Sequence, residues 1–270
     1  MEQNLVIEVN ISDYILTPLS CASLVEQFLK SLLYQKSQIP YPYTWLKSSV
    51  NRRRNRVNVT EGIQSNGTYQ FKIENQYRIA SKLYDGLEDI MNELAKELSK
   101  NTVSEIFILF GPTPLCPKEV CRIKIPILAA GHFEEAHVKD ALKYQHNALR
   151  QIFMSNSWMD SIDSSIPCTN TFIFITKLQD DGSQMTLLKA CQPLNFQKNV
   201  KQYTIKVNWD SLQNYACCKI FDDSNEPTEY EVIANSTEQT ERNIMWYQFD
   251  HSLEGYKNIY INGKGVSELW

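Results

Sequence analysis

The chain has 270 residues, of which 43% are hydrophobic and 21% charged, and its formal net charge is −4. This small negative charge argues against nucleic acid or an acidic membrane surface as a partner. The start, MEQNLVIEVN, lacks the positive and apolar regions of a secretory signal, and no segment approaches the roughly 18 consecutive apolar residues that a membrane span needs. The seven cysteines follow no disulfide framework, so we expect reduced thiols in an intracellular compartment and unused glycosylation sequons at Asn10, Asn58, Asn66 and Asn235.

The N-terminal region predicts an extended leader followed by an amphipathic helix. Residues 1–20 form the leader, whose short apolar patch is typical of an edge strand. The helix is expected over residues 23–35, because Ser23 and Glu26 have the spacing of a capping box and two prolines follow. The polar residues at its exit, Tyr34, Gln35 and Lys36, are then free to face a partner. The apolar residues of this helix recur at helical spacing: Leu24, Val25, Phe28, Leu29, Leu32 and Leu33.

A polar loop and a long helix are expected next. Residues 47–68 are polar and contain a basic cluster from Arg52 to Arg56, which predicts a solvated loop or, alternatively, a nuclear localisation signal. From Ile73 to Leu98, apolar residues recur every three to four positions over about seven turns. This pattern predicts an amphipathic helix, and the strand signals on both sides favour packing on a sheet over a coiled coil.

The rest of the chain predicts strands and a third helix. The apolar run 105–110 indicates a buried central strand, and the alternation over 121–127 indicates a strand with one solvent-facing side. The third helix is expected over 134–159. We therefore expect one α+β domain over residues 1–270, with helices packed on a mostly antiparallel sheet. The other expected strands cover 171–179 and 185–190, paired as a hairpin across Asp180–Gly182, and then 203–209, 216–221, 229–234 and 244–249.

The sequence assembles no recognisable catalytic motif. Neither of the phosphate-binding patterns G-x-G-x-x-G and G-x-x-x-x-G-K-[ST] occurs, and the nucleophile motif G-x-S-x-G is also missing. No C-x-x-C pair is present, His132 and His137 straddle a helix start, and Asp160 and Asp163 are better explained as caps and turn formers. We therefore expect a protein that is not an enzyme and that carries no cofactor or metal, with an unrecognised hydrolase as the alternative.

The third helix has a wider apolar arc than burial against a core usually needs. On a helical wheel the arc spans roughly 140°, against ~100° for an ordinary amphipathic helix. The excess lies along one edge, where Leu142, Leu149 and Phe153 lie beside His146. Two interpretations stay open: a well-buried helix, or an apolar rim that docks a helix of a partner.

Several segments, in order, resemble the comet protein family, the spindle-checkpoint silencing factors that bind the mitotic-arrest-deficient HORMA protein. The matching segments lie between about residues 20 and 257 and read FLKSLLYQKSQIPYPYTWLK, IFILFGPTPLCPKE, LRQIFM, PLNF and MWYQFDHSLEGYK. The resemblance implies a HORMA-like fold with three main helices on the sheet. It also implies a C-terminal safety-belt region over 190–261 that is closed on the chain's own segment around 244–261.

The resemblance also implies partners and a location. A comet protein forms a pseudo-symmetric dimer with the closed conformer of the checkpoint HORMA protein and delivers it to the pachytene-checkpoint AAA+ ATPase, which dismantles the mitotic checkpoint complex. The ATP chemistry belongs to that ATPase. The expected location is the nucleus and cytoplasm, and the spindle or kinetochore in mitosis.

The site residues carried over from the family fall on two surfaces. The polar contact at the exit of the first helix falls on Gln35, and the aromatic anchor of the third helix falls on Leu149, where leucine is smaller than the family's aromatic residue. The family's ATPase-contacting Pro-Lys pair aligns with Gln192 and Pro193, so the lysine is lost. With the apolar edge, the expected protein-binding residues are Gln35, Leu142, His146, Leu149 and Phe153.

A HORMA-fold scaffold that clasps a short peptide in a chromosome or repair complex is the alternative to a comet-type adaptor. A pulldown separates the two, because an adaptor captures the closed checkpoint HORMA protein and a scaffold captures peptides that carry its motif.

Overall fold

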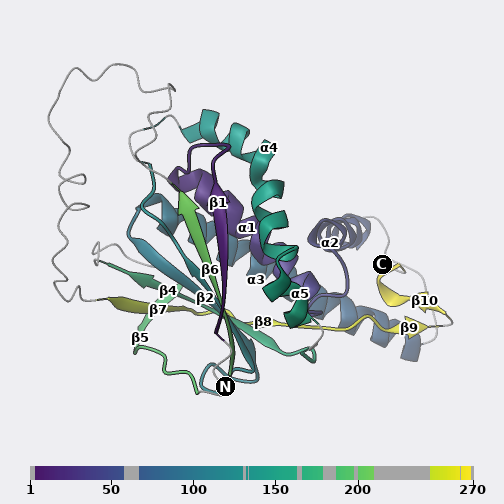
Figure 1. Ribbon diagram of the computed structural model, residues 1–270. Helices are drawn as coiled ribbons and strands as arrows, with labels where there is room; N and C mark the ends of the chain where they lie inside the picture. The colour runs from purple at the N-terminus through teal and green to yellow at the C-terminus, as the bar shows by residue number, and fades with distance from the viewer. Residues whose placement is uncertain are drawn as a thin grey trace, which may run out of the picture.

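A computed structural model describes the protein over residues 4–57, 67–129, 132, 134–162, 166–178, 187–197, 200–209, 244–261 and 263–268. A twisted mixed sheet carries the helices on one face, as Figure 1 shows. The α+β class expected from the sequence is therefore confirmed. The expected strands over 216–221 and 229–234 lie outside the described residues. Among the described helices, none is long and apolar enough to cross a membrane.

The main sheet has the strand order β1-β6-β3-β2-β4-β7-β5, with β8 paired to β4. Strand β6 pairs in parallel with both β1 and β3, and the remaining pairs are antiparallel. The expected edge strand in the leader is confirmed as β1, and the expected central strand is confirmed as β2. The bounds are β1 Asn4–Ile11, β2 Val103–Gly111, β3 Glu119–Lys124, β4 Asn170–Lys177, β5 Leu188–Cys191, β6 Lys201–Trp209, β7 Met245–Phe249 and β8 Leu253–Glu254.

The predicted hairpin between β4 and β5 is wrong. These two strands do not pair with each other, because β7 lies between them and forms antiparallel ladders with both. The Asp-Asp-Gly segment that suggested a tight turn lies outside the described residues. Strand β7, from near the C-terminus, thus lies beside β4, where the local sequence pattern predicted β5.

Five α-helices are described, and all of their bounds differ from those predicted; α3, for example, begins at Gly67 instead of Ile73. The first begins five residues earlier than expected, since Thr17 and Ser20 form its capping box, and Glu26 instead pairs with Lys30. The third predicted helix ends at Phe153, and a separate short helix follows it. The expected loop over 47–68 is wrong for residues 47–57, which belong to a helix, and for 67–68, which begin the next one, while 58–66 lie outside the described residues. The helices are α1 Pro18–Gln35, α2 Tyr43–Val57, α3 Gly67–Ser99, α4 Glu134–Phe153 and α5 Asn156–Ile162.

Helix α2 forms in a polar sequence because one of its sides is buried in the core, and its arginines add ion pairs at the surface. Arg53 donates to Glu74 at 2.9 Å and Arg54 donates to Asp85 at 2.7 Å, both on α3. The other side of the helix places Tyr43, Leu46 and Val50 in the core. Two arginines of the basic cluster are therefore engaged within the fold.

The core lies between the helices and one face of the sheet. The stripe predicted for the long helix is confirmed, because Ala80, Leu83, Leu87, Ile90, Leu94 and Leu98 of α3 are all buried. A smaller cluster covers the opposite face of the sheet. It contains Phe107, Leu109, Val120, Phe174 and Val200, with Leu194 and Phe196 packed against it.

The segment after β7 is fastened to α1 through the fully buried Gln38. Its side-chain nitrogen donates to the Lys36 carbonyl at 2.6 Å, and its side-chain oxygen accepts the Thr169 backbone N–H at 2.8 Å. The Tyr256 N–H donates to the Gln38 carbonyl at 3.0 Å. From there the chain, yellow in Figure 1, runs toward the N-terminal half of α3 through β9 (Tyr260–Ile261), β10 (Lys264–Gly265) and the 3-10 helix η1 (Val266–Glu268).

The segment after β7 passes so close to Gln38 and Thr169 that no room is left for a side chain at Gly255. A Cβ atom there would lie 2.8 Å from both the Gln38 side-chain oxygen and the Thr169 carbonyl oxygen. We expect Gly255→Ala to lower the free energy of unfolding by about 1–3 kcal/mol, as overpacked substitutions do. Gly86→Ala is the matched control, since its nearest neighbour is Leu253 at 3.4 Å and alanine is favoured inside a helix by about 1 kcal/mol. Denaturant unfolding of both variants checks this, and a Gly255→Ala variant as stable as the wild type would contradict it.

Candidate partner-binding face

Helix α4 has a buried stripe and, one position further along the chain, an edge stripe. The buried stripe consists of Ala141, Gln145, Ala148 and Ile152. Adding one residue turns the helix by about 100°, so the next positions form a line on its flank. This line is the edge stripe: Leu142, His146, Leu149 and Phe153. Leu142 is 56% exposed and His146 is exposed, whereas Leu149 and Phe153 are half-buried and pack against the core.

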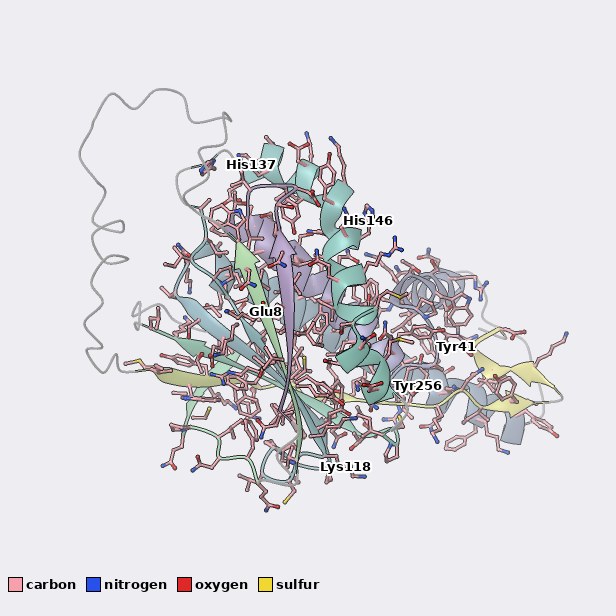
Figure 2. The ribbon with its side chains drawn as sticks, in the orientation of Figure 1. Glu8, Tyr41, Lys118, His137, His146 and Tyr256 are labelled. Carbon is pink, nitrogen blue, oxygen red and sulfur yellow. The ribbon has the colours of Figure 1, made fainter. Side chains whose placement is uncertain are left out.

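Polar contacts on its other sides fix how α4 is rotated. Toward α1, Ser23 donates to the Gln145 side-chain oxygen at 3.3 Å. Toward β1, the Gln151 amide forms two 2.9 Å bonds with the backbone N–H and carbonyl of Asn10. Gln151 and the edge stripe lie on opposite flanks of the helix, and Figure 2 shows His146 turned away from Glu8 of β1. Leu142 and His146 of the edge stripe are thereby exposed to solvent, whereas Leu149 and Phe153 are partly covered by the core.

Helix α5 is attached to the end of α4 by a buried aromatic cluster. Trp158 is fully buried, and its ring lies 5.3 Å from that of Phe153 and 5.7 Å from that of Tyr203. Phe153 in turn stacks on Phe28 of α1, with 5.7 Å between ring centroids. Aromatic pairs at these separations add stability beyond their buried area. The C-terminal end of α4 is therefore held against α1 by contacts between aromatic rings.

A buried ion pair lies against the same cluster. Lys36, at the end of α1, pairs with Glu119 of β3, and the two side chains are almost completely buried. The Lys36 ammonium also lies 4.9 Å from the Trp158 ring centroid and 4.7 Å from that of Tyr203. A buried ammonium needs such partners, because an unpaired charge in the interior is very unfavourable. The pair thus joins the end of α1 to the sheet, and the expectation that Lys36 is free to face a partner is wrong because its side chain is buried.

Gln35 lies half-buried at the exit of α1, and its contact with a partner stays a prediction. Its side-chain oxygen accepts a 2.7 Å hydrogen bond from the Trp158 indole N–H, so this oxygen is engaged inside the protein. The half-buried residue therefore joins α1 to α5. The contact between Trp158 and Gln35 was not predicted from the sequence, because the predicted helix ran on to residue 159 without a break. A signal was nevertheless present: Ser155 caps the new helix by accepting the Trp158 backbone N–H at 3.2 Å.

Gln192 and Pro193 lie far from α4, in a segment that crosses the opposite face of the sheet. Both side chains are exposed, while Leu194 and Phe196 pack on the sheet. The Phe196 ring lies 6.2 Å from that of Phe107. The segment is thus anchored by two apolar residues, and it presents the dipeptide to solvent without a lysine at either position.

The cysteine, histidine and acidic side chains in the described regions have structural roles. Burial raises the pKa of the Cys21 thiol to about 12, and burial also raises the pKa of the Cys121 thiol, so both stay protonated at neutral pH. Within the described ranges, no group of three His, Cys, Asp or Glu residues is placed to hold a metal ion. The exposed apolar and aromatic surface of α4 is suited to binding another protein.

A protein-family model described as "p31comet: Mad1 and Cdc20-bound-Mad2 binding" matches residues 13–203, which is more than half of the chain. The chain belongs to the p31comet family. The match spans α1, α4, α5 and the segment with Gln192 and Pro193, and it ends within β6. No curated protein matches the sequence.

Membership of the p31comet family confirms the resemblance found in the sequence. The α+β architecture, with its mostly antiparallel mixed sheet, is consistent with the HORMA-like fold expected from it. The family description concerns binding to Mad2 that is already bound to Mad1 or Cdc20. Helices α1 and α4, which carry the residues transferred from the family, both lie in the matched range.

Proposed function

We propose that this p31comet family member is a non-enzymatic adaptor that binds the closed conformer of Mad2 as a pseudo-dimer and thereby silences the mitotic checkpoint. The observation that carries this proposal is the family match over residues 13–203, whose description is binding to Cdc20-bound Mad2. The proposed contact surface is the edge stripe of α4. Leu142 and His146 are exposed there, and Leu149 supplies a half-buried apolar contact in place of an aromatic one.

The position of β7 favours the adaptor over the peptide-clasping scaffold. This strand pairs with β4 over four residues and with β5 over four residues, so the chain's own C-terminal segment fills the slot between them. An external peptide would first have to displace both ladders. We therefore propose that residues 1–270 form one HORMA-like domain whose safety-belt region, 190–261, is closed on its own strand.

Delivery to a pachytene-checkpoint AAA+ ATPase is the second part of the proposal. The exposed pair Gln192 and Pro193 lies on the opposite face of the sheet from α4, so one face could hold Mad2 while the other meets the ATPase. Because the family's lysine is absent, we expect a weaker ATPase contact. A nuclear and cytoplasmic location, with the spindle or kinetochore in mitosis, is proposed from the family membership.

Titration calorimetry with purified Mad2 tests the adaptor proposal. The chain should bind Mad2 loaded with a Cdc20 peptide in a one-to-one complex, visible also by size-exclusion chromatography with light scattering. Empty, open Mad2 is the control and should bind far more weakly. Absence of heat and of a shifted peak with peptide-loaded Mad2 would overturn the proposal, whereas capture of short motif peptides instead would support the scaffold.

A further inference from the structure

Strand β1 forms one edge of the main sheet, and its outer side is covered at one end by a side chain. The strand pairs in parallel with β6 over all eight of its residues, and no described strand lies on its other side. At the C-terminal end of β1, the Gln151 amide takes the place of a neighbouring strand, because it bonds both the N–H and the carbonyl of Asn10 at 2.9 Å. The backbone groups of Asn10 therefore point away from β6.

The alternation of the β-strand extends this orientation along β1. Every second residue of a strand directs its N–H and C=O groups to the same side. Val6 and Glu8 lie four and two positions before Asn10, so their four backbone groups also point outward, whereas those of Ile7 and Val9 face β6. Within the described ranges, no residue forms a hydrogen bond with these four outward groups. A strand edge with free backbone groups is a template for pairing with a further strand.

The side chains along this edge indicate which kind of strand fits it. Val6 is 53% exposed and Glu8 is exposed on the same face of the sheet, since side chains of a strand alternate between its faces. The Glu8 carboxylate lies 3.7 Å from the Lys206 ammonium of β6, which is a loose pair between two exposed groups. The outer side of this carboxylate is therefore open to a second cation on an added strand, and opposite charges on neighbouring strands stabilise their pairing.

We propose that the outer edge of β1, from Leu5 to Val9, binds an extended segment of a partner protein as an additional antiparallel strand, with a β-branched residue opposite Val6 and a basic residue opposite Glu8. In this mode of recognition the main-chain hydrogen bonds provide affinity and the alternate side chains provide selectivity. The antiparallel direction is chosen because it is the more stable pairing per residue. A single segment fits better than a second copy of the chain, because a symmetric pair of β1 strands would bring both α4 helices, which pack beside β1, to the same side of the joined sheet.

This edge is separate from the surface proposed to bind Mad2. Gln151, which covers the Asn10 end of β1, lies on the flank of α4 opposite the edge stripe. A strand added to β1 therefore leaves Leu142 and His146 accessible. The edge of β1 would thus hold a second partner while Mad2 is bound.

Amide hydrogen exchange of the free protein tests the orientation of the backbone groups. In the full ¹⁵N-labelled chain, the amides of Val6 and Glu8 should exchange more than about tenfold faster than those of Ile7 and Val9, because only the latter face a neighbouring strand. Equal protection of all four amides would overturn the proposal, since it would show that the outer side of β1 is already paired.

The blocked peptide acetyl-Thr-Lys-Thr-Val-Thr-Thr-amide serves as the probe for strand addition. In an antiparallel pair its lysine lies opposite Glu8 and its valine opposite Val6. In large excess it should slow exchange at the Val6 and Glu8 amides by about fivefold, the effect of one hydrogen bond, and leave Ile7 unchanged. No slowing would overturn the proposal. Slowing that grows with protein concentration alone, together with a dimer in light scattering, would show a second copy at this edge and would also overturn it.

A charge exchange tests the pairing register. Glu8→Lys should abolish the response to the lysine peptide, because like charges on opposed strand positions repel, and should create a response to acetyl-Thr-Glu-Thr-Val-Thr-Thr-amide. Glu254→Lys makes the same change at an exposed position of β8 and is the matched control, which should leave the response to the lysine peptide unchanged within about twofold. A Glu8→Lys variant that responds to both peptides as the wild type does would contradict the register.

Proline substitutions separate the outer from the inner side of β1. Val6→Pro removes an outward N–H and leaves the ladder with β6, so the protein should stay folded while the peptide no longer protects Glu8. Ile7→Pro removes an N–H that faces β6 and should lower the melting temperature much more. Equal melting temperatures of the two variants would overturn the assigned orientation. Val6→Pro should bind Cdc20-peptide-loaded Mad2 as the wild type does, so the strand-binding edge and the proposed function can fail independently.

Discussion

Replacing Leu142 with arginine is expected to weaken binding to Cdc20-peptide-loaded Mad2 by about thirtyfold or more. Loss of an apolar side chain that is buried at an interface commonly costs about 2 kcal/mol, and burying an unpaired guanidinium adds to this loss. Because Leu142 is 56% exposed in the free protein, the change should leave the melting temperature within a few degrees. Binding affinity and folding can therefore be measured separately at this position by titration calorimetry and thermal melts.

Tyr144→Arg is the matched control for this experiment. Tyr144 is also an exposed apolar residue of α4, but it lies on the flank opposite the edge stripe. Its replacement should change the affinity by less than about twofold, as for a surface position outside an interface. Equal losses of affinity in the Leu142→Arg and Tyr144→Arg variants would show that α4 does not bind Mad2 through the edge stripe.

Leu149→Ala should behave differently from Leu142→Arg. Leu149 is half-buried and packs against the core, so its truncation should lower both the affinity for Mad2 and the melting temperature. Leu149→Phe, which restores the aromatic residue of the family, should bind as well as or better than the wild type.

The largest expected effect on stability comes from Lys36→Met. This change leaves Glu119 without its partner at a position where only 1% of the residue is exposed, and it removes the cation from the Trp158 and Tyr203 rings. Breaking a buried ion pair from one side costs about 3–5 kcal/mol, so we expect a loss of that size in urea unfolding.

The double variant Lys36→Met/Glu119→Leu tests the cause of this loss. With both charges removed, no ion stays unpaired in the interior, and apolar side chains of similar size can fill the space. The double variant should therefore be considerably more stable than Lys36→Met alone. If both variants lose the same stability, the unpaired carboxylate of Glu119 is not the source of the effect.

Local patterns in the sequence were sufficient to predict those helices and strands that bury one continuous stripe of side chains. The repeat in α3 and the apolar run of β2 predict their structure without reference to the rest of the chain, because each is long and strongly periodic. The edge stripe of α4 was also visible as an arc wider than core burial needs. Family-specific segments in the sequence then indicated the partner, which neither composition nor periodicity could do.

Only the tertiary structure decided the features that join distant parts of the chain. Helix α2 is polar by composition and forms because Tyr43, Leu46 and Val50 pack into the core, with surface ion pairs to α3 as a smaller contribution. Strands β4 and β5 fail to form a hairpin because β7 lies between them. Gln35 accepts a hydrogen bond from Trp158, 123 residues away in the sequence, and this contact joins α1 to α5. Periodicity reports which side of an element is buried, whereas the identity of its neighbour depends on contacts between distant segments, and no local pattern encodes these.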